Sequence, residues 1–92
     1  MTKEHLDVLL TAANADKAKD GWREVASGRE LTLYVATGGA NLTVSRITGV
    51  KDGGELLEAR TVKGEHYVLA RDTVFAGAVD DSSEKPRKAG FV

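Results

Sequence analysis

Four acidic residues in the middle of the chain are the side chains best suited to acid–base chemistry. Asp52, Glu55, Glu58 and Glu65 lie close enough in sequence to supply paired carboxylates. Such a pair works as general acid and base when the protein environment tunes the two groups differently. These four fall on turns and exposed strand positions, where carboxylates are usually solvated. We therefore predict that the chain has no catalytic residues and is not an enzyme.

Signatures of cofactor and metal chemistry are also missing. The glycine pairs at 38–39 and 53–54 belong to neither a GxGxxG nor a GxxxxGK[ST] pattern. No serine and histidine stand in a recognisable nucleophile–base order. Cysteine is absent, and the two histidines, His5 and His66, are far apart in sequence. We therefore predict no cofactor and no metal ion.

Composition describes one small, nearly neutral domain. The 92 residues include 13 basic and 14 acidic side chains, and aromatic residues make up only 5%. Balanced charge does not indicate a dedicated nucleic-acid protein, and the first residues do not read as a secretory signal. We expect a cytoplasmic protein that does not associate with membranes. A small core built mainly from aliphatic residues is marginal, which favours a homo-oligomer.

The first third of the chain predicts one helix and a connector. The helix should cover residues 2–19, with Thr2 as N-cap and Gly21 as its stop. Its apolar stripe is spaced at helical periodicity: Leu6, Leu9, Leu10 and Ala13. Residues 20–29 then connect to the next element, and Trp22 should pack between the helix and a barrel.

Residues 30–79 predict a strongly bent β-structure. Five β-type runs occur at 30–37, 41–50, 55–62, 65–70 and 74–79, separated by glycine turns or, before the last, by a short polar break. In the second run the apolar positions change parity near Ser45 and Arg46, which indicates a bulge. We therefore expect a mainly β domain with an N-terminal helix, in which five antiparallel strands form a small barrel of Sm-like or SH3-like type. Residues 1–79 would form this domain, and the charged residues 80–92 a flexible C-terminal tail.

Three segments resemble the sequence motifs of the Sm/LSm superfamily, which includes the bacterial RNA chaperone Hfq. Residues 33–38 are similar to the strand and turn glycine of the first Sm motif. Residues 49–52, followed by 56–58, are similar to the glycine, turn aspartate and next strand of that motif, and residues 67–74 look like the second motif. The resemblance implies a helix followed by five bent strands, with one helical turn between strands four and five. It also implies a ring in which the last two strands pair with neighbouring subunits.

The same resemblance implies where a ligand would bind. In a ring of Sm type, two turns lie around the central pore; in this chain they carry Lys51, Asp52, Arg71 and Asp72. Repeated around a ring, the two cations would contact single-stranded RNA, unless the aspartates pair with them instead. Asn41 could add hydrogen bonds to the bases.

Subunit contacts are expected from the last two strands, namely Tyr67, Leu69, Val74 and Ala76. Two functions stay open at this point. One is a ring that binds RNA at its pore-side turns. The other is a non-catalytic module that binds protein partners and no nucleic acid, favoured by the balanced charge and by the missing aromatic residue in the first turn.

Overall fold

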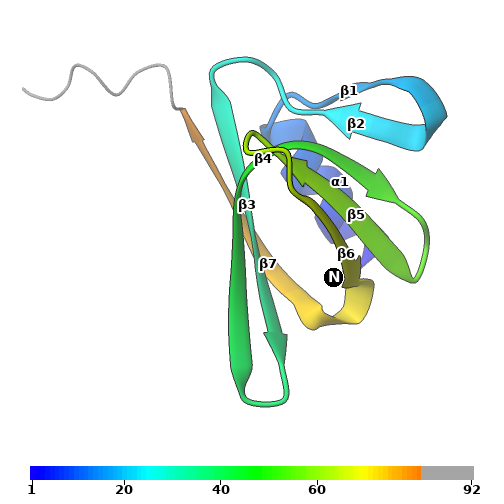
Figure 1. The fold of residues 1–92 in the computed structure, drawn as a ribbon. Helices are drawn as coiled ribbons and strands as arrows, with labels where there is room; N and C mark the ends of the chain where they lie inside the picture. The colour runs from blue at the N-terminus through cyan, green and yellow to red at the C-terminus, as the bar shows by residue number, and fades with distance from the viewer. Residues whose placement is uncertain (82–92) are drawn as a thin grey trace, which may run out of the picture.

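The computed structural model describes residues 1–81, which form a curled antiparallel sheet with one helix (Figure 1). Two 3₁₀ turns, η1 (Lys19–Gly21) and η2 (Arg71–Thr73), precede strands β2 and β7. The remaining elements are α1 (Lys3–Ala12), β1 (Asp16–Lys17), β2 (Trp22–Glu24), β3 (Arg29–Thr37), β4 (Ala40–Asp52), β5 (Leu56–Thr61), β6 (His66–Ala70) and β7 (Val74–Asp81). The sheet curls into half a barrel, so the prediction of a mainly β fold with an N-terminal helix is confirmed.

The order of the main strands leaves the half-barrel open. The strands lie in the order β7-β3-β4-β5-β6, and the β1–β2 hairpin is added beside the second half of β4. Within residues 1–81, β6 pairs only with β5, and β7 pairs only with β3. Each of these two strands therefore has one unpaired edge. The single turn η2 connects them, as expected for a short break between the last two strands.

A bulge in β4 produces the bend, as the change of parity predicted. The register with β3 slips between Leu31 and Leu33, so that Ser45 and Arg46 both lie opposite Thr32. Arg46 adopts a left-handed backbone conformation with φ of 56°. That conformation costs a non-glycine residue about 1–2 kcal/mol. The bulge lets the first half of β4 pair with β3 and the second half with β5.

The helix is shorter than predicted. Thr2 is the N-cap, and its hydroxyl accepts a hydrogen bond from the His5 amide at 3.0 Å. The helix ends at Ala12 and not near Lys19, because Asn14 turns the chain with φ of 52°. The Ala15 amide then donates back to the Leu10 carbonyl at 2.9 Å and closes the helix end. Alanine-rich composition favoured a longer helix, but the burial of Ala15 requires the chain to turn.

The predicted stripe of α1 is its buried face. Leu6, Leu9 and Leu10 join the main hydrophobic core together with residues from β3, β4, β5, β6 and β7. Leu9 lies against β7 at Gly77, where an added Cβ atom would collide with the leucine side chain. Glycine is required here because the helix approaches the strand closely. The helix thus covers the open half-barrel at the β7 side.

The connector prediction for residues 20–29 is wrong in part. The β1–β2 hairpin occupies much of this region, and β2 pairs with the second half of β4. The side chain of Arg23 reaches back to the Ala15 carbonyl near the helix. Successive strand residues point to opposite faces, so Trp22 lies on the other face of the sheet. It does not pack between the helix and the barrel.

The last strand is longer than predicted and includes the first two residues of the expected tail. Asp80 pairs with Glu30, and Asp81 pairs with Arg29. The Arg29 guanidinium lies 3.2 Å from the Asp81 carboxylate. This ion pair and the β3 register carry β7 past Val79, although the composition becomes charged there. The rest of the predicted tail, 82–92, lies outside the described residues.

Candidate functional site

The two charged turns lie side by side at one end of the half-barrel. The Arg71 amide donates to the Glu55 carbonyl at 2.9 Å, and Leu56 pairs with Ala70 across β5 and β6. The first turn is shaped by Asp52, whose carboxylate accepts a hydrogen bond from the Gly54 amide at 2.9 Å. Asp52 and Arg71 are 19 positions apart in the sequence. The pairing of β5 with β6 brings their turns together.

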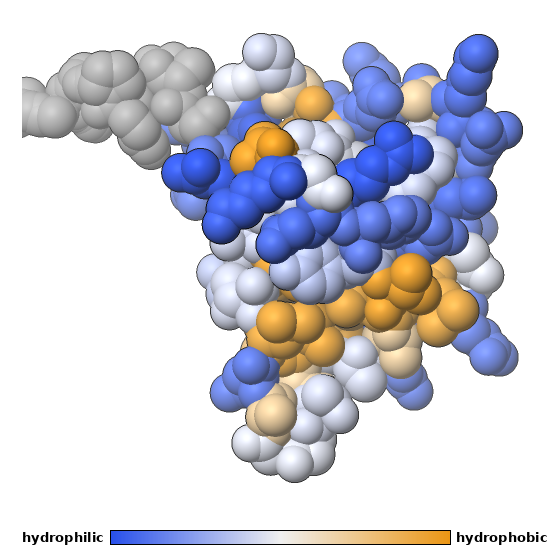
Figure 2. All heavy atoms as spheres, viewed as in Figure 1, coloured by the Kyte–Doolittle hydropathy of each residue, from blue (hydrophilic) through white to orange (hydrophobic). Residues whose placement is uncertain are grey.

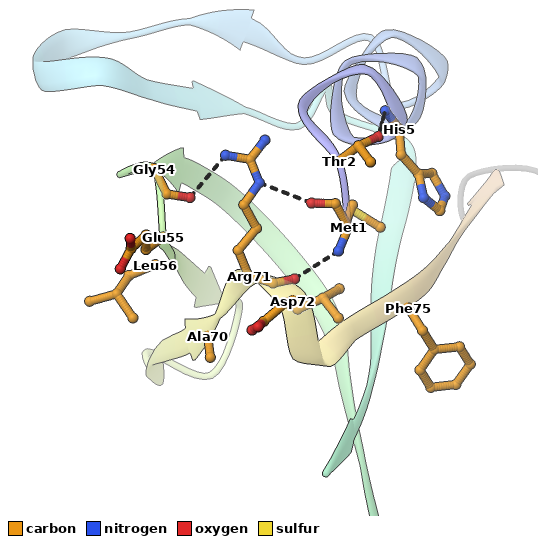
Figure 3. A pocket seen from close by; sticks show the side chains of 11 residues that line it. Met1, Thr2, His5, Gly54, Glu55, Leu56, Ala70, Arg71, Asp72 and Phe75 are labelled. Carbon is orange, nitrogen blue, oxygen red and sulfur yellow. Dashed lines mark hydrogen bonds between the residues drawn. The ribbon is translucent and has the colours of Figure 1, made fainter.

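Arg71 ties the two turns to the start of the chain. Its Nη1 atom donates to the Asp52 carboxylate at 3.1 Å and to the Gly54 carbonyl at 2.9 Å. Its Nε atom donates to the Met1 carbonyl at 2.9 Å, and the Met1 nitrogen donates to the Arg71 carbonyl at 2.8 Å (Figure 3). The Arg71 side chain is only 17% exposed. We call these contacts the Arg71 clamp. In them the guanidinium binds acceptors within the chain and holds the two turns and the N-terminus together.

An open groove of about 840 Å³ lies beside the Arg71 clamp. Apolar side chains from several elements line it: Met1, Leu56, Ala70, Val74 and Phe75. His5, Glu55 and Asp72 add polar groups (Figure 3). In Figure 2, hydrophobic atoms gather on the surface around the ends of β5 and β6 and the start of β7. The groove is therefore an exposed, largely apolar surface at the end of the strands with unpaired edges.

The residues predicted to contact RNA are only partly brought together. Asp52 and Arg71 form an ion pair, and Asp72 lines the groove. Lys51 is half-buried and stands between Trp22 and Glu58 in the register of the sheet. Asn41 is exposed beside the β3–β4 turn and does not line the groove. Of the two cations predicted to contact RNA, Arg71 is already bound within the chain.

The residues predicted to contact other subunits face inward to different degrees. The side chains of Leu69 and Val74 are buried, and Tyr67 packs half-buried against the core. Ala76 is half-buried opposite Tyr34. Their strand neighbours Val68 and Phe75 are 59% and 58% exposed.

The sequence did contain the signal for those exposed neighbours. Strand side chains alternate between faces, so a buried Leu69 places Val68 outside. Phe75 follows the same rule beside Val74, and its ring centroid lies 6.4 Å from that of Tyr34. The surface that β6 and β7 offer to a partner thus consists of their backbone edges with Val68 and Phe75.

The outer face of the sheet carries an aromatic and charged cluster that sequence reasoning missed. The Arg60 guanidinium lies 3.8 Å from the Trp22 ring centroid, and the His66 ring meets the indole edge-on at 5.7 Å. The Glu58 carboxylate lies 2.9 Å from His66 Nε2. Gly49 leaves room for the indole. Because Arg60 covers it and it is 9% exposed, Trp22 is not an open stacking platform.

The carboxylates considered for catalysis are separated. Asp52 pairs with Arg71, Glu58 with His66, and Glu65 accepts a hydrogen bond from the Thr61 hydroxyl at 3.2 Å. Glu55 alone of the four lines the groove. Within residues 1–81, no group of three or more histidine, aspartate or glutamate side chains could hold a metal ion.

Comparison with known proteins gives no match to a family model, to a curated protein or to a solved structure. In the part of the chain that the structure describes, no helix has the length and apolar character needed to cross a membrane.

Proposed function

We propose that this chain is a non-catalytic, Sm-like assembly module whose copies join edge to edge into a ring. One observation carries the proposal: β6 and β7 each leave an edge unpaired within residues 1–81, on either side of η2. An unpaired strand edge is a template for pairing with another chain. Addition of a strand from the next copy would extend the sheet across that edge.

The arrangement of elements supports the Sm-like reading. The helix and the short β1–β2 hairpin precede five bent antiparallel strands, β3 to β7, and one helical turn separates the last two. The β4 bulge supplies the bend. Exposed Val68 and Phe75 stand on the two edge strands, where a neighbouring copy would cover them. A chain of this size gains apolar burial from such a contact.

The contacts at the charged turns favour a protein partner over RNA. Arg71 is occupied by the Asp52 carboxylate and by two carbonyl groups. Asp72 adds a negative charge beside the groove. Lys51 remains as the cation of these turns without an ion pair within residues 1–81, and each neighbouring copy would bring the same balanced charges.

The test is the solution mass of the purified chain, measured by light scattering and native mass spectrometry over a range of concentrations. We expect a closed oligomer of fixed subunit number. Val68→Asp combined with Phe75→Asp should reduce it to a monomer that keeps its circular dichroism spectrum. The matched control is Val8→Asp, which charges an exposed valine on α1 (69% exposed), outside both edge strands.

Three results would contradict the proposal. A wild-type monomer at all concentrations removes the ring. Equal loss of the oligomer in the Val8→Asp control shows that added charge, and not the strand edges, decides assembly. Salt-sensitive binding of oligo(U) or oligo(A) that disappears in Lys51→Ala shows instead that the charged turns bind RNA.

A further inference from the structure

Arg46 is the one arginine in the described residues that has no partner. Arg23, Arg29 and Arg71 each make an ion pair with an aspartate. The guanidinium of Arg60 covers the Trp22 ring. The Arg46 side chain makes no hydrogen bond, ion pair or aromatic contact within residues 1–81, and the residue is exposed. Its charge is therefore available to a ligand.

The backbone at Arg46 is energetically unfavourable for arginine. This residue adopts φ of 56° in the β4 bulge, a conformation that glycine or asparagine would adopt with less strain. Its carbonyl accepts a hydrogen bond from the Val62 amide at 3.0 Å, which fixes the bulge beside the β5–β6 turn. The position bends the strand for any residue type, so the fold itself does not require arginine there. A strained residue whose side chain has no structural partner points to a binding role.

Arg46 lines a polar cleft of about 350 Å³. It lies where β4 before the bulge approaches the β5–β6 turn, and its lining residues are Thr43, Ser45, Arg46, Lys63, Glu65 and Tyr67. Two cations and three hydroxyl-bearing side chains thus meet one carboxylate. That carboxylate, on Glu65, already accepts a hydrogen bond from the Thr61 hydroxyl. The hydroxyls of Thr43, Ser45 and Tyr67 make no hydrogen bond to another described residue.

We propose that this cleft binds a phosphate-class oxyanion, either inorganic phosphate or the phosphate of a small phosphomonoester. A guanidinium fork, an ammonium group and hydroxyl donors are the groups that bind phosphate oxygens. Arg46 would supply the directed contacts, and Lys63 would supply charge from the β5–β6 turn. The cleft shares no lining residue with the groove beside the Arg71 clamp, and Tyr67 is its one lining residue from β6.

The test is a titration of the ¹⁵N-labelled chain with inorganic phosphate and glycerol phosphate, at constant ionic strength maintained with chloride. We expect saturable shifts of the amide signals of Arg46, Lys63 and Tyr67. The anion that fits the cleft better should saturate these shifts at the lower concentration. Arg46→Gly should weaken binding by about tenfold to a hundredfold, because it removes charge-assisted hydrogen bonds. The same variant should be as stable as the wild type or more stable, because glycine adopts positive φ freely.

Two further variants keep the result unambiguous. Arg46→Asn tolerates the same backbone conformation and should also lose phosphate affinity. Lys17→Ala removes one positive charge from an exposed site on β1 and should leave affinity unchanged. Absence of saturable shifts, equal affinity in Arg46→Gly, or equal loss in Lys17→Ala would overturn the proposal. So would shifts caused by oligo(U) but by neither small anion, which would assign the cleft to an RNA backbone.

Discussion

Replacement of Arg71 by alanine should destabilise the fold, because this side chain holds three separate segments together. The ion pair with Asp52 is partly exposed, with side-chain exposures of 17% and 29%, and contributes about 0.5–1 kcal/mol. The two bonds to the Gly54 and Met1 carbonyls are charge-assisted but partly solvated, and together contribute about 1–2 kcal/mol. The free energy of unfolding should therefore fall by about 1.5–3 kcal/mol.

The assay is urea denaturation followed by the fluorescence of Trp22, the one tryptophan in the chain. Arg71→Lys keeps the charge but loses the planar fork, so we expect an intermediate loss. Asp52→Ala removes the ion pair and the acceptor for the Gly54 amide. A double-mutant cycle of Arg71→Ala with Asp52→Ala should give a coupling of about 0.5–1 kcal/mol, the contribution of the ion pair alone.

Two results would refute the structural role of Arg71. If Arg71→Ala changed the free energy of unfolding by less than about 0.5 kcal/mol, the contacts of the clamp would not matter in solution. If the same variant lost affinity for oligo(U) while remaining stable, Arg71 would be a ligand-binding residue. Lys17→Ala serves as the control for net charge in both measurements.

Two packing contacts allow further tests. Gly77→Ala should destabilise the fold by about 1–3 kcal/mol through overpacking against Leu9, and in a Leu9→Ala background the same change should cost little; equal losses in urea denaturation would contradict the contact. Gly49→Val should push the indole of Trp22 from beneath Arg60 and shift its emission to longer wavelength, because a Cβ added at Gly49 would lie 3.4 Å from the ring, with two further methyl groups beyond it. Gly49→Ala is the milder control, and unchanged emission in both variants would place Trp22 elsewhere.

The bend of β4 was predictable because it leaves a local trace in the sequence. Leu42 and Val44 have one parity and Ile47 the other, and only an extra residue can place both sets correctly. The turns at 38–39, 53–54 and 64 were predictable for a similar reason, since Gly38, Gly54 and Gly64 adopt positive φ. Local chemistry is sufficient for features of this kind.

Features that depend on distant contacts were not predictable. The helix ends at Ala12 because Asn14 turns and Ala15 is buried, while the helix propensity of the alanines continues to residue 18. Strands β1 and β2 are too short to show alternation. Met1 and Arg71 are 70 positions apart, so nothing in the sequence connects them.

The contrast between Arg71 and Arg46 shows why charge in a turn does not by itself locate a ligand site. The resemblance to a ring-forming family drew attention to Arg71, yet its guanidinium is bound by three acceptors within the chain. For Arg46 the sequence pattern predicted only a bulge in the strand and no ligand contact. Its guanidinium has no acceptor within residues 1–81. A cation whose bonds are satisfied must break them before it binds a phosphate, whereas an unpaired cation in a polar cleft pays no such cost. If both arginines were replaced by alanine in turn, stability should respond at Arg71 and phosphate affinity at Arg46, and the reverse assignment would contradict this reasoning at both sites.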